Sequence, residues 1–163
     1  MPAETARMKL TDRLVGTQAP AAALLIRLLA GVVFFAEGVK KFLFVAQWGA
    51  GRLATIGIPH PEVMAPFVGV VEIVCGLLLL IGLFGRPAAL LLLINISVAI
   101  ATTKIPMLMA KGFWEMEDKA RTDYSMFLSL LFLLIVGSGA WSLDAWIASR
   151  STKRAADKVP PPG

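Results

Sequence analysis

The chain has 163 residues, of which 57% are hydrophobic and 17% are charged, and its mean hydropathy is +0.74. This balance lies outside the usual range of water-soluble globular domains and points to a membrane protein. The net charge of +5 does not indicate a nucleic-acid-binding protein, because the basic residues are scattered among tails and loops. Anionic lipid headgroups account for them more simply. With one Cys and one His, the chain has too few ligands for an internal disulfide, a dithiol redox pair, a usual zinc site or a bis-histidine haem.

Four apolar segments have about the 20 residues that a helix needs to cross the hydrocarbon core of a bilayer. They are residues 21–44, 63–84, 87–103 and 124–145. Within the second and third segments every helical face is apolar, as expected for helices surrounded by lipid rather than for a soluble four-helix bundle. The sequence therefore predicts an all-α protein, an integral membrane four-helix bundle with two interfacial outer loops.

The transmembrane domain is predicted to cover residues 21–146. A polar N-terminal tail of residues 1–20 precedes it, and a polar tail of residues 147–163, which ends in prolines and is expected to be disordered, follows it. Residues 1–20 lack the layout of a cleavable signal peptide, so the first span is expected to remain as a signal anchor. Basic residues are almost evenly divided between the two sides. We favour cytoplasmic termini because acidic residues accompany the basic ones in the outer loops.

The two outer loops are expected to lie on the bilayer surface as lids over the helix ends. Residues 47–62 predict a short interfacial helix followed by a rigid turn, and residues 104–123 mix aromatic side chains with alternating charges. On the opposite side, the sequence Gly85-Arg86-Pro87 predicts a tight reversal that makes the second and third spans antiparallel neighbours. The four tryptophans fall at span ends or in loops, where they are expected to anchor the protein in the membrane.

Polar residues inside the predicted spans are the candidates for function. Arg27 and Glu37 lie in opposite halves of the first span, Glu72 near the middle of the second and Asn95 near the middle of the third. A charge at that depth costs about 2.5 kcal/mol or more, so each group should face the bundle and have a partner.

Residue spacing places the first-span charges beside small residues. Arg27, Gly31, Phe34, Gly38 and Lys41 recur at steps of three and four, which puts them on one helix face. The second span repeats the pattern with Gly69, Glu72 and Gly76. Small residues beside a charge let two helices approach closely.

The same spacing leaves several partners open. Glu37 and Lys41 are four residues apart and are able to pair within their helix. Glu72 has no charged neighbour in its own span. It is therefore expected to pair with Arg27, to pair with a basic residue from another helix, or to be protonated. Lys104 is a further partner for either carboxylate.

The candidate ligand-pocket residues are therefore Arg27, Glu37, Lys41, Glu72, Asn95 and Lys104. Three interpretations remain open for them: a buried network that fixes helix register, a polar pocket for a small molecule or headgroup, and a proton path. No metal site is expected, since the lone histidine lies in a proline-flanked turn and the lone cysteine lies in an apolar span.

Four sequence stretches, in order, resemble the DoxX family of small four-helix bacterial membrane proteins. They are residues 35–42 (FAEGVKKF), the turn Gly57-Ile58-Pro59, residues 68–83 (VGVVEIVCGLLLLIGL) followed by Arg86, and the ending 137–144 (GSGAWSLD). The resemblance covers about residues 24–146 and implies a bacterial inner-membrane location. Because the family's namesakes are linked to thiosulfate:quinone oxidoreductase, it also implies an accessory or quinone-facing role in a membrane oxidoreductase or detoxification system.

Three functions stay open at this point. The first is the oxidoreductase component, in which electrons pass through a bound quinone or a redox partner protein, since the chain has no intrinsic cofactor ligands of its own. The second is a small-solute or proton-coupled carrier, which with four helices would have to form a homo-oligomer. The third is a non-catalytic scaffold that recruits a partner protein through its outer loops.

Overall fold

The computed structural model describes residues 21–156, and within them the backbone forms six α-helices and no β-strand. The helices are α2 (Ala23–Leu43), α3 (Ala50–Thr55), α4 (Pro61–Ile81), α5 (Gly85–Lys111), α6 (Phe113–Val136) and α7 (Leu143–Ala156). The predicted all-α class is therefore confirmed for this part of the chain. The tail predicted for residues 1–20 and the end of the second tail, residues 157–163, lie outside the described residues.

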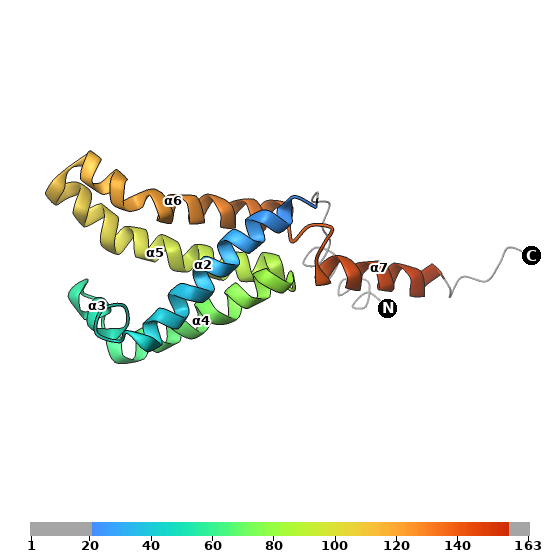
Figure 1. Cartoon of the computed structure of the whole chain (residues 1–163), viewed down its shortest axis with the longest axis horizontal. Helices are drawn as coiled ribbons and strands as arrows, with labels where there is room; N and C mark the ends of the chain where they lie inside the picture. The colour runs from blue at the N-terminus through green and yellow to red at the C-terminus, as the bar shows by residue number, and fades with distance from the viewer. Residues whose placement is uncertain (1–20, 157–163) are drawn as a thin grey trace, which may run out of the picture.

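Four helices of 21 to 27 residues, α2, α4, α5 and α6, pack side by side (Figure 1). The most extensive contacts join α2 to α4 and α5 to α6, and α4 also packs along α5. The two pairs lie close together near α7 and diverge toward α3 and the tip of the α5–α6 hairpin (Figure 1). The short helix α3 packs on α4 at this wider end.

The core between these helices is narrow and apolar. Ala30, Leu79, Leu92 and Leu130 have no exposed surface at all. Large apolar side chains are also exposed on the outside of every long helix, including Leu25, Val32, Val63, Phe67, Leu91, Ile94 and Ile135. A molecule that is apolar both inside and outside suits a lipid environment.

Among the described helices, α4 and α5 are long and apolar enough to cross a membrane. Only 33% of the most apolar stretch of α4 and 22% of that of α5 is buried within the molecule. A core helix of a soluble protein would be mostly buried, so the exposure of these two helices favours contact with lipid.

The connection between α4 and α5 is a short reversal. Gly82 ends α4 with φ +70°, a left-handed conformation that favours glycine, and the Leu83 N–H donates to the Leu78 carbonyl at 3.0 Å. Helix α5 then begins at Gly85 and packs against α4. The predicted antiparallel pairing of these two helices is confirmed, although residues 85–87 form the first turn of α5 rather than the reversal itself.

The first outer loop is also confirmed as a short helix followed by a turn. Helix α3 occupies residues 50–55, and the chain turns through Gly57, with φ +78°, and His60, with φ +50°. Pro61 occupies the first helical turn of α4, where its missing N–H leaves no bond unmade. The position of α3 at a bilayer surface stays a prediction.

The prediction of a second outer loop at residues 104–123 is wrong. Residues 104–111 continue α5, residues 113–123 begin α6, and the helices are separated at Gly112, whose φ of +85° favours glycine. Arg121 pairs with Glu117 at 3.4 Å and with Asp118 at 3.1 Å, contacts that stabilise a helix. The alternating charges in this segment show no helical apolar period, so the sequence predicts a loop. The segment is nevertheless helical, and the ion pairs of Arg121 stabilise that helix.

Two further boundaries differ from the prediction. Helix α6 ends at Val136 rather than near residue 145, because Gly137 and Gly139 both take positive φ and break the helix. The tail predicted to be disordered from residue 147 is instead helical as far as Ala156, within α7. Its apolar residues Trp146 and Ile147 follow Leu143 at helical spacing.

Candidate functional site

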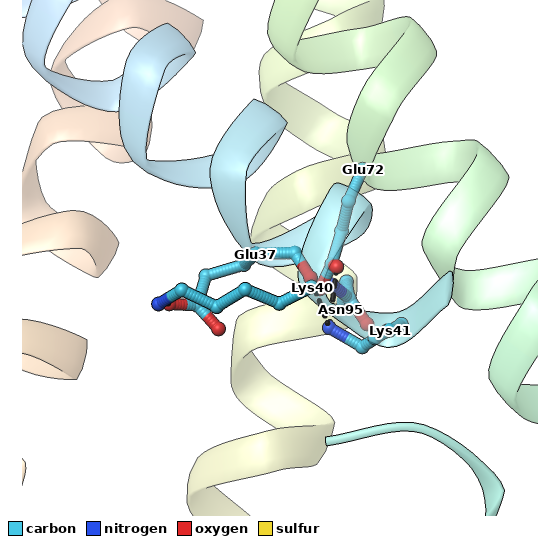
Figure 2. Close-up of polar contacts among 5 residues, drawn as sticks. All are labelled: Glu37, Lys40, Lys41, Glu72 and Asn95. Atoms are coloured by element: carbon cyan, nitrogen blue, oxygen red, sulfur yellow. Dashed lines mark hydrogen bonds and ion pairs between the residues drawn. The ribbon is translucent and has the colours of Figure 1, made fainter. Parts of the chain in front are cut away.

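Glu72 of α4 lies at the centre of a polar network inside the bundle (Figure 2). It is only 5% exposed, and it is contacted by groups from two other helices. Its Oε2 lies 2.5 Å from the Lys41 Nζ of α2, and its Oε1 accepts a hydrogen bond from the Asn95 Nδ2 of α5 at 2.8 Å. These two donors offset the free-energy cost of burying a carboxylate. We call Glu72, Lys41 and Asn95 the Glu72 network.

Glycines bring α2 and α4 close enough for this network to form. A Cβ added at Gly38 would lie 2.7 Å from the Gly69 carbonyl oxygen, and one at Gly76 would lie 2.8 Å from the Phe35 backbone nitrogen. Both distances are too short for real contacts, so the two backbones pack against each other directly. At this separation the Lys41 side chain reaches from α2 to the Glu72 carboxylate.

The helix faces predicted from residue spacing are confirmed. On α2 the buried residues include Arg27, Gly31, Phe34 and Gly38, and on α4 they include Gly69, Glu72 and Gly76. The ion pairs differ from the Glu37–Lys41 pair that residue spacing allows within α2. Glu37 pairs through Oε1 with Lys40 at 2.6 Å, while the Lys41 Nζ reaches Glu72.

A cavity of about 540 Å³ lies beside the Glu72 network, at the wide end of the molecule. Side chains from α2, α3, α4, α5 and α6 line it. The polar lining includes Glu37, Lys41, Glu72, Asn95, Thr102, Thr103, Lys104, Lys119 and Asp123, and the apolar lining includes Phe34, Leu53, Ile58, Val68 and Ile96. A volume of this size, with apolar walls and a few convergent polar groups, is typical of small-molecule sites.

The wall opposite α2 is fixed by a second ion pair. Lys104 of α5 pairs with Asp123 of α6 at 2.9 Å and donates to the Lys119 carbonyl at 2.7 Å. The predicted pairing of Lys104 with Glu37 or Glu72 is therefore wrong. The reason is the extra helical length of the hairpin, which places an acidic residue of α6 directly beside Lys104.

Arg27 lies outside this cavity and forms a separate polar centre near α7. It is 2% exposed, and its guanidinium donates to four backbone carbonyls. The acceptors are Leu79 (2.9 Å), Ser138 (2.7 Å), Trp141 (2.8 Å) and Leu80 (3.2 Å). Arg27 thus ties the end of α4 to the segment after α6, instead of meeting Glu72.

Asp144 completes this centre and was missed as a site residue from the sequence. Its carboxylate is 1% exposed and accepts from the N–H groups of Phe84 (2.9 Å) and Gly85 (3.1 Å) at the start of α5. The Ser138 hydroxyl donates to its Oδ2 at 2.7 Å. A carboxylate suits a helix N-terminus because it meets unpaired N–H groups and the positive end of the helix dipole. The only sequence signal was its place in the GSGAWSLD ending. We call Arg27, Ser138 and Asp144 the Arg27 centre.

Five of the six sequence-predicted pocket residues thus surround one cavity, and Arg27 does not. Trp48, Arg52 and Asp123 also line the cavity and were not singled out for a pocket. Arg52 lies in the short helix that the sequence predicts and Trp48 lies beside it, but nothing in the sequence indicates that this helix borders a pocket. Asp123 lies on the extended part of α6, which no apolar pattern indicates. Among the described residues, no group of three or more His, Cys, Asp or Glu side chains is arranged to hold a metal ion.

Comparison with known proteins places the chain in a family. The DoxX family model matches residues 22–105, about half of the chain. The chain belongs to the DoxX family. The matched segment contains α2, α3, α4 and most of α5, and so includes all three residues of the Glu72 network.

Its relatives include proteins of several bacteria. An uncharacterized membrane protein of Mycobacterium tuberculosis is 47% identical over 146 residues, which cover 86% of this chain and 90% of the relative. A Bacillus subtilis protein named "Putative oxidoreductase CatD" is 29% identical, covering 76% and 85% of the two chains. An uncharacterized protein of Haemophilus influenzae is 31% identical, covering 73% and 85%. No solved structure matches the chain significantly.

Proposed function

We propose that this DoxX-family membrane protein is a component of a membrane oxidoreductase system and that it binds a quinone-like molecule in the cavity beside Glu72. The observation that carries the proposal is the position of the Glu72 carboxylate, held by Lys41 and Asn95 from two other helices at the edge of a cavity of about 540 Å³. The name of the Bacillus subtilis relative supports the redox assignment.

The proposal includes four membrane spans, α2, α4, α5 and α6, in the inner membrane, with both termini in the cytoplasm. Exposed apolar side chains on α2, such as Leu25 and Val32, and on α6, such as Phe132 and Ile135, support spans beyond α4 and α5. We expect a cysteine introduced by Thr55→Cys in a Cys75→Ser background to react with an impermeant maleimide from outside intact cells. One introduced by Ser149→Cys should react only after permeabilisation. The reverse pattern would contradict this orientation.

The lining of the cavity suits a ring that carries two carbonyl oxygens. Apolar side chains, including Phe34 and Val68, provide the surface that a ring needs. The volume of the cavity lies within the ordinary range for ligand sites. Lys41 has three ammonium hydrogens, of which one binds Glu72 and one reaches the Glu37 carbonyl at 3.5 Å, so the third is able to donate to a ligand oxygen. A bound quinone would supply the electron-accepting group that the side chains of this chain lack.

The side chains themselves position the ligand and manage protons. The Glu72 carboxylate lines the cavity and is able to hold or release a proton, and Lys41 balances its charge. Cys75 is buried, and it is the only cysteine in the chain, so dithiol exchange within one copy is excluded by number. Electrons would therefore have to arrive from a partner protein.

The test is direct binding of decylubiquinone and of a short-chain menaquinone to the purified full-length protein in nanodiscs. We expect both wild type and Glu62→Gln to bind, because Glu62 lies on the same helix but is exposed and away from the cavity. Glu72→Gln should bind about tenfold more weakly, because the neutral amide no longer holds the Lys41 ammonium in place to donate to the quinone oxygen, and a hydrogen bond from a charged group has about this value. Equal affinity of Glu72→Gln and Glu62→Gln, or no binding by wild type, would refute the quinone site.

The partner is tested separately. Cross-linking in native membranes, followed by identification of the linked proteins, should recover a redox protein with wild type. Recovery of copies of this chain alone would contradict the need for a partner and would instead support a homo-oligomer.

A further inference from the structure

Between the end of α2 and α3, where Trp48 and Arg52 also line the cavity, two cations from different helices meet one indole ring. The Trp48 ring centroid lies 5.6 Å from the Lys40 Nζ of α2 and 5.0 Å from the Arg52 Cζ of α3. Each distance is within the range of a cation–π contact. Trp48 is 40% exposed, so the two cations and the ring are open to an approaching molecule.

The charges at this point do not balance. The Lys40 Nζ donates to the Glu37 Oε1 at 2.6 Å, which uses one of its three hydrogens. Arg52 has no carboxylate within ion-pair distance among the described residues. Two positive charges therefore face one negative charge, and the arrangement is complementary to one added anion.

An exposed apolar strip adjoins the two cations. Phe42, Leu43, Phe44 and Val45, which precede Trp48 by three to six residues, are between 45% and 69% exposed. Phe42 and Leu43 end α2, and Phe44 and Val45 follow it directly. Four exposed apolar residues at a helix end are suited to contact acyl chains, and an indole near them is suited to the headgroup level of a bilayer.

We infer that Lys40, Arg52 and Trp48 form a binding site for the phosphate of an anionic phospholipid, with its acyl chains lying along residues 42–45. The guanidinium and the ammonium donate to the phosphate, and Trp48 contacts the glycerol. The occupant follows from the joint presence of an unbalanced positive charge and a continuous apolar strip, since a soluble anion needs only the first. The inference does not depend on quinone binding in the cavity.

The opposite end of the molecule provides a natural contrast. Trp146 carries one cation, Arg150 at 3.8 Å, and both residues belong to α7. A single cation from the same helix makes no two-sided site, so Arg150→Gln is a matched control that removes a tryptophan-bound cation without removing the proposed lipid site.

The experiment is native mass spectrometry of the full-length protein released from nanodiscs that contain equal amounts of phosphatidylglycerol and phosphatidylcholine. We expect wild type and Arg150→Gln to retain one phosphatidylglycerol in preference to phosphatidylcholine. Lys40→Gln and Arg52→Gln should each lower that preference about fivefold, the value of about one basic residue near a lipid surface. All four proteins should have nearly the same melting temperature in pure phosphatidylcholine, since Arg52 and Arg150 are exposed and Lys40 is part-exposed and loses only a surface ion pair.

Two results would overturn the inference. One is an unchanged phosphatidylglycerol preference in the Lys40→Gln/Arg52→Gln double variant. The other comes from a second arm, in which lipid-depleted protein in detergent receives inorganic phosphate or short-chain phosphatidylglycerol. If inorganic phosphate raises the melting temperature as much as the lipid does, and Arg52→Gln removes the effect, the ligand is a free anion. Stabilisation by the lipid alone supports the phospholipid site.

Discussion

The packed pair α2 and α4 carries a polar centre toward each end, and the two centres are built differently. At one end Arg27 is 2% exposed and directs four of its five N–H hydrogens at backbone carbonyls, so its surroundings use almost the whole guanidinium. At the other end Glu72 is held by two donors, but the side chain of its partner Lys41 keeps 13% exposure and borders a cavity. A polar group that only joins helices can be satisfied completely by protein. A polar group that meets a ligand has to keep some of its capacity free.

The largest expected effect is from Arg27→Met. This change removes the donor from four backbone carbonyls, of which the Leu79 carbonyl keeps a bond from the Gly82 N–H, and each buried group left unsatisfied costs about 1–3 kcal/mol. We expect a loss of at least about 3 kcal/mol in the free energy of unfolding, measured by titration with SDS in mixed micelles. Arg121→Met, which removes only exposed ion pairs, should change it by less than about 0.5 kcal/mol. Similar losses in the two variants would show that Arg27 does not join the helices as described.

Next in size is Gly38→Ala, which pushes α2 away from α4. The new Cβ meets the Gly69 carbonyl, a backbone atom that has little freedom to move, so we expect a loss of about 2 kcal/mol. Gly31→Ala should be milder, because its Cβ first meets the side chain of Leu80, which is able to rotate. The same SDS titration distinguishes them, and a larger effect at Gly31 would contradict this order.

Asp144→Asn should have a moderate effect. The amide keeps one acceptor but loses the negative charge at the start of α5, which predicts a loss of about 1–2 kcal/mol. Asp118→Asn, on the exposed face of α6, is the control. No difference in melting temperature between the two variants would remove Asp144 from the Arg27 centre.

The smallest change in stability is expected at the Lys41–Glu72 pair, where the comparison separates a ligand-binding centre from a purely structural one. Replacing both partners, Lys41→Met together with Glu72→Met, removes the ion pair without leaving a buried charge, so the free energy of unfolding should stay within about 1 kcal/mol of wild type. Quinone binding should be lost in the same protein. If the double variant is destabilised as strongly as Arg27→Met, both centres are structural, and the cavity needs another explanation.

The helix faces and the residues of the Glu72 network were predictable from the sequence. Steps of three and four residues placed Gly38 and Lys41 on one face of α2 and Glu72 with Gly69 on one face of α4, and the structure joins these faces. The pairing itself was less predictable, because Lys40 and Lys41 both follow Glu37 at helical distances. Which lysine turns inward depends on the rotation of α2 against α4.

The acceptors of Arg27 and the shape of the cavity could not be predicted. Backbone carbonyls are the same in every residue, so nothing in the sequence indicates that Arg27 binds the end of α4 rather than a carboxylate. The extension of α5 and α6 was missed because its charged residues have no apolar period. That extension places Lys104 beside Asp123 and so decides what faces the Glu72 network.

Helix α5 contains Pro106, and this residue has a consequence for the width of the cavity. Proline has no N–H, so the carbonyl of Thr102, four residues earlier, receives no bond from the helical ladder. Thr102 and Thr103 both border the cavity, so the missing bond lies at the level of the cavity wall. With one backbone hydrogen bond fewer, we expect α5 to bend more easily at this level than an uninterrupted helix would, and such a bend would change the distance between the α5–α6 hairpin and α3.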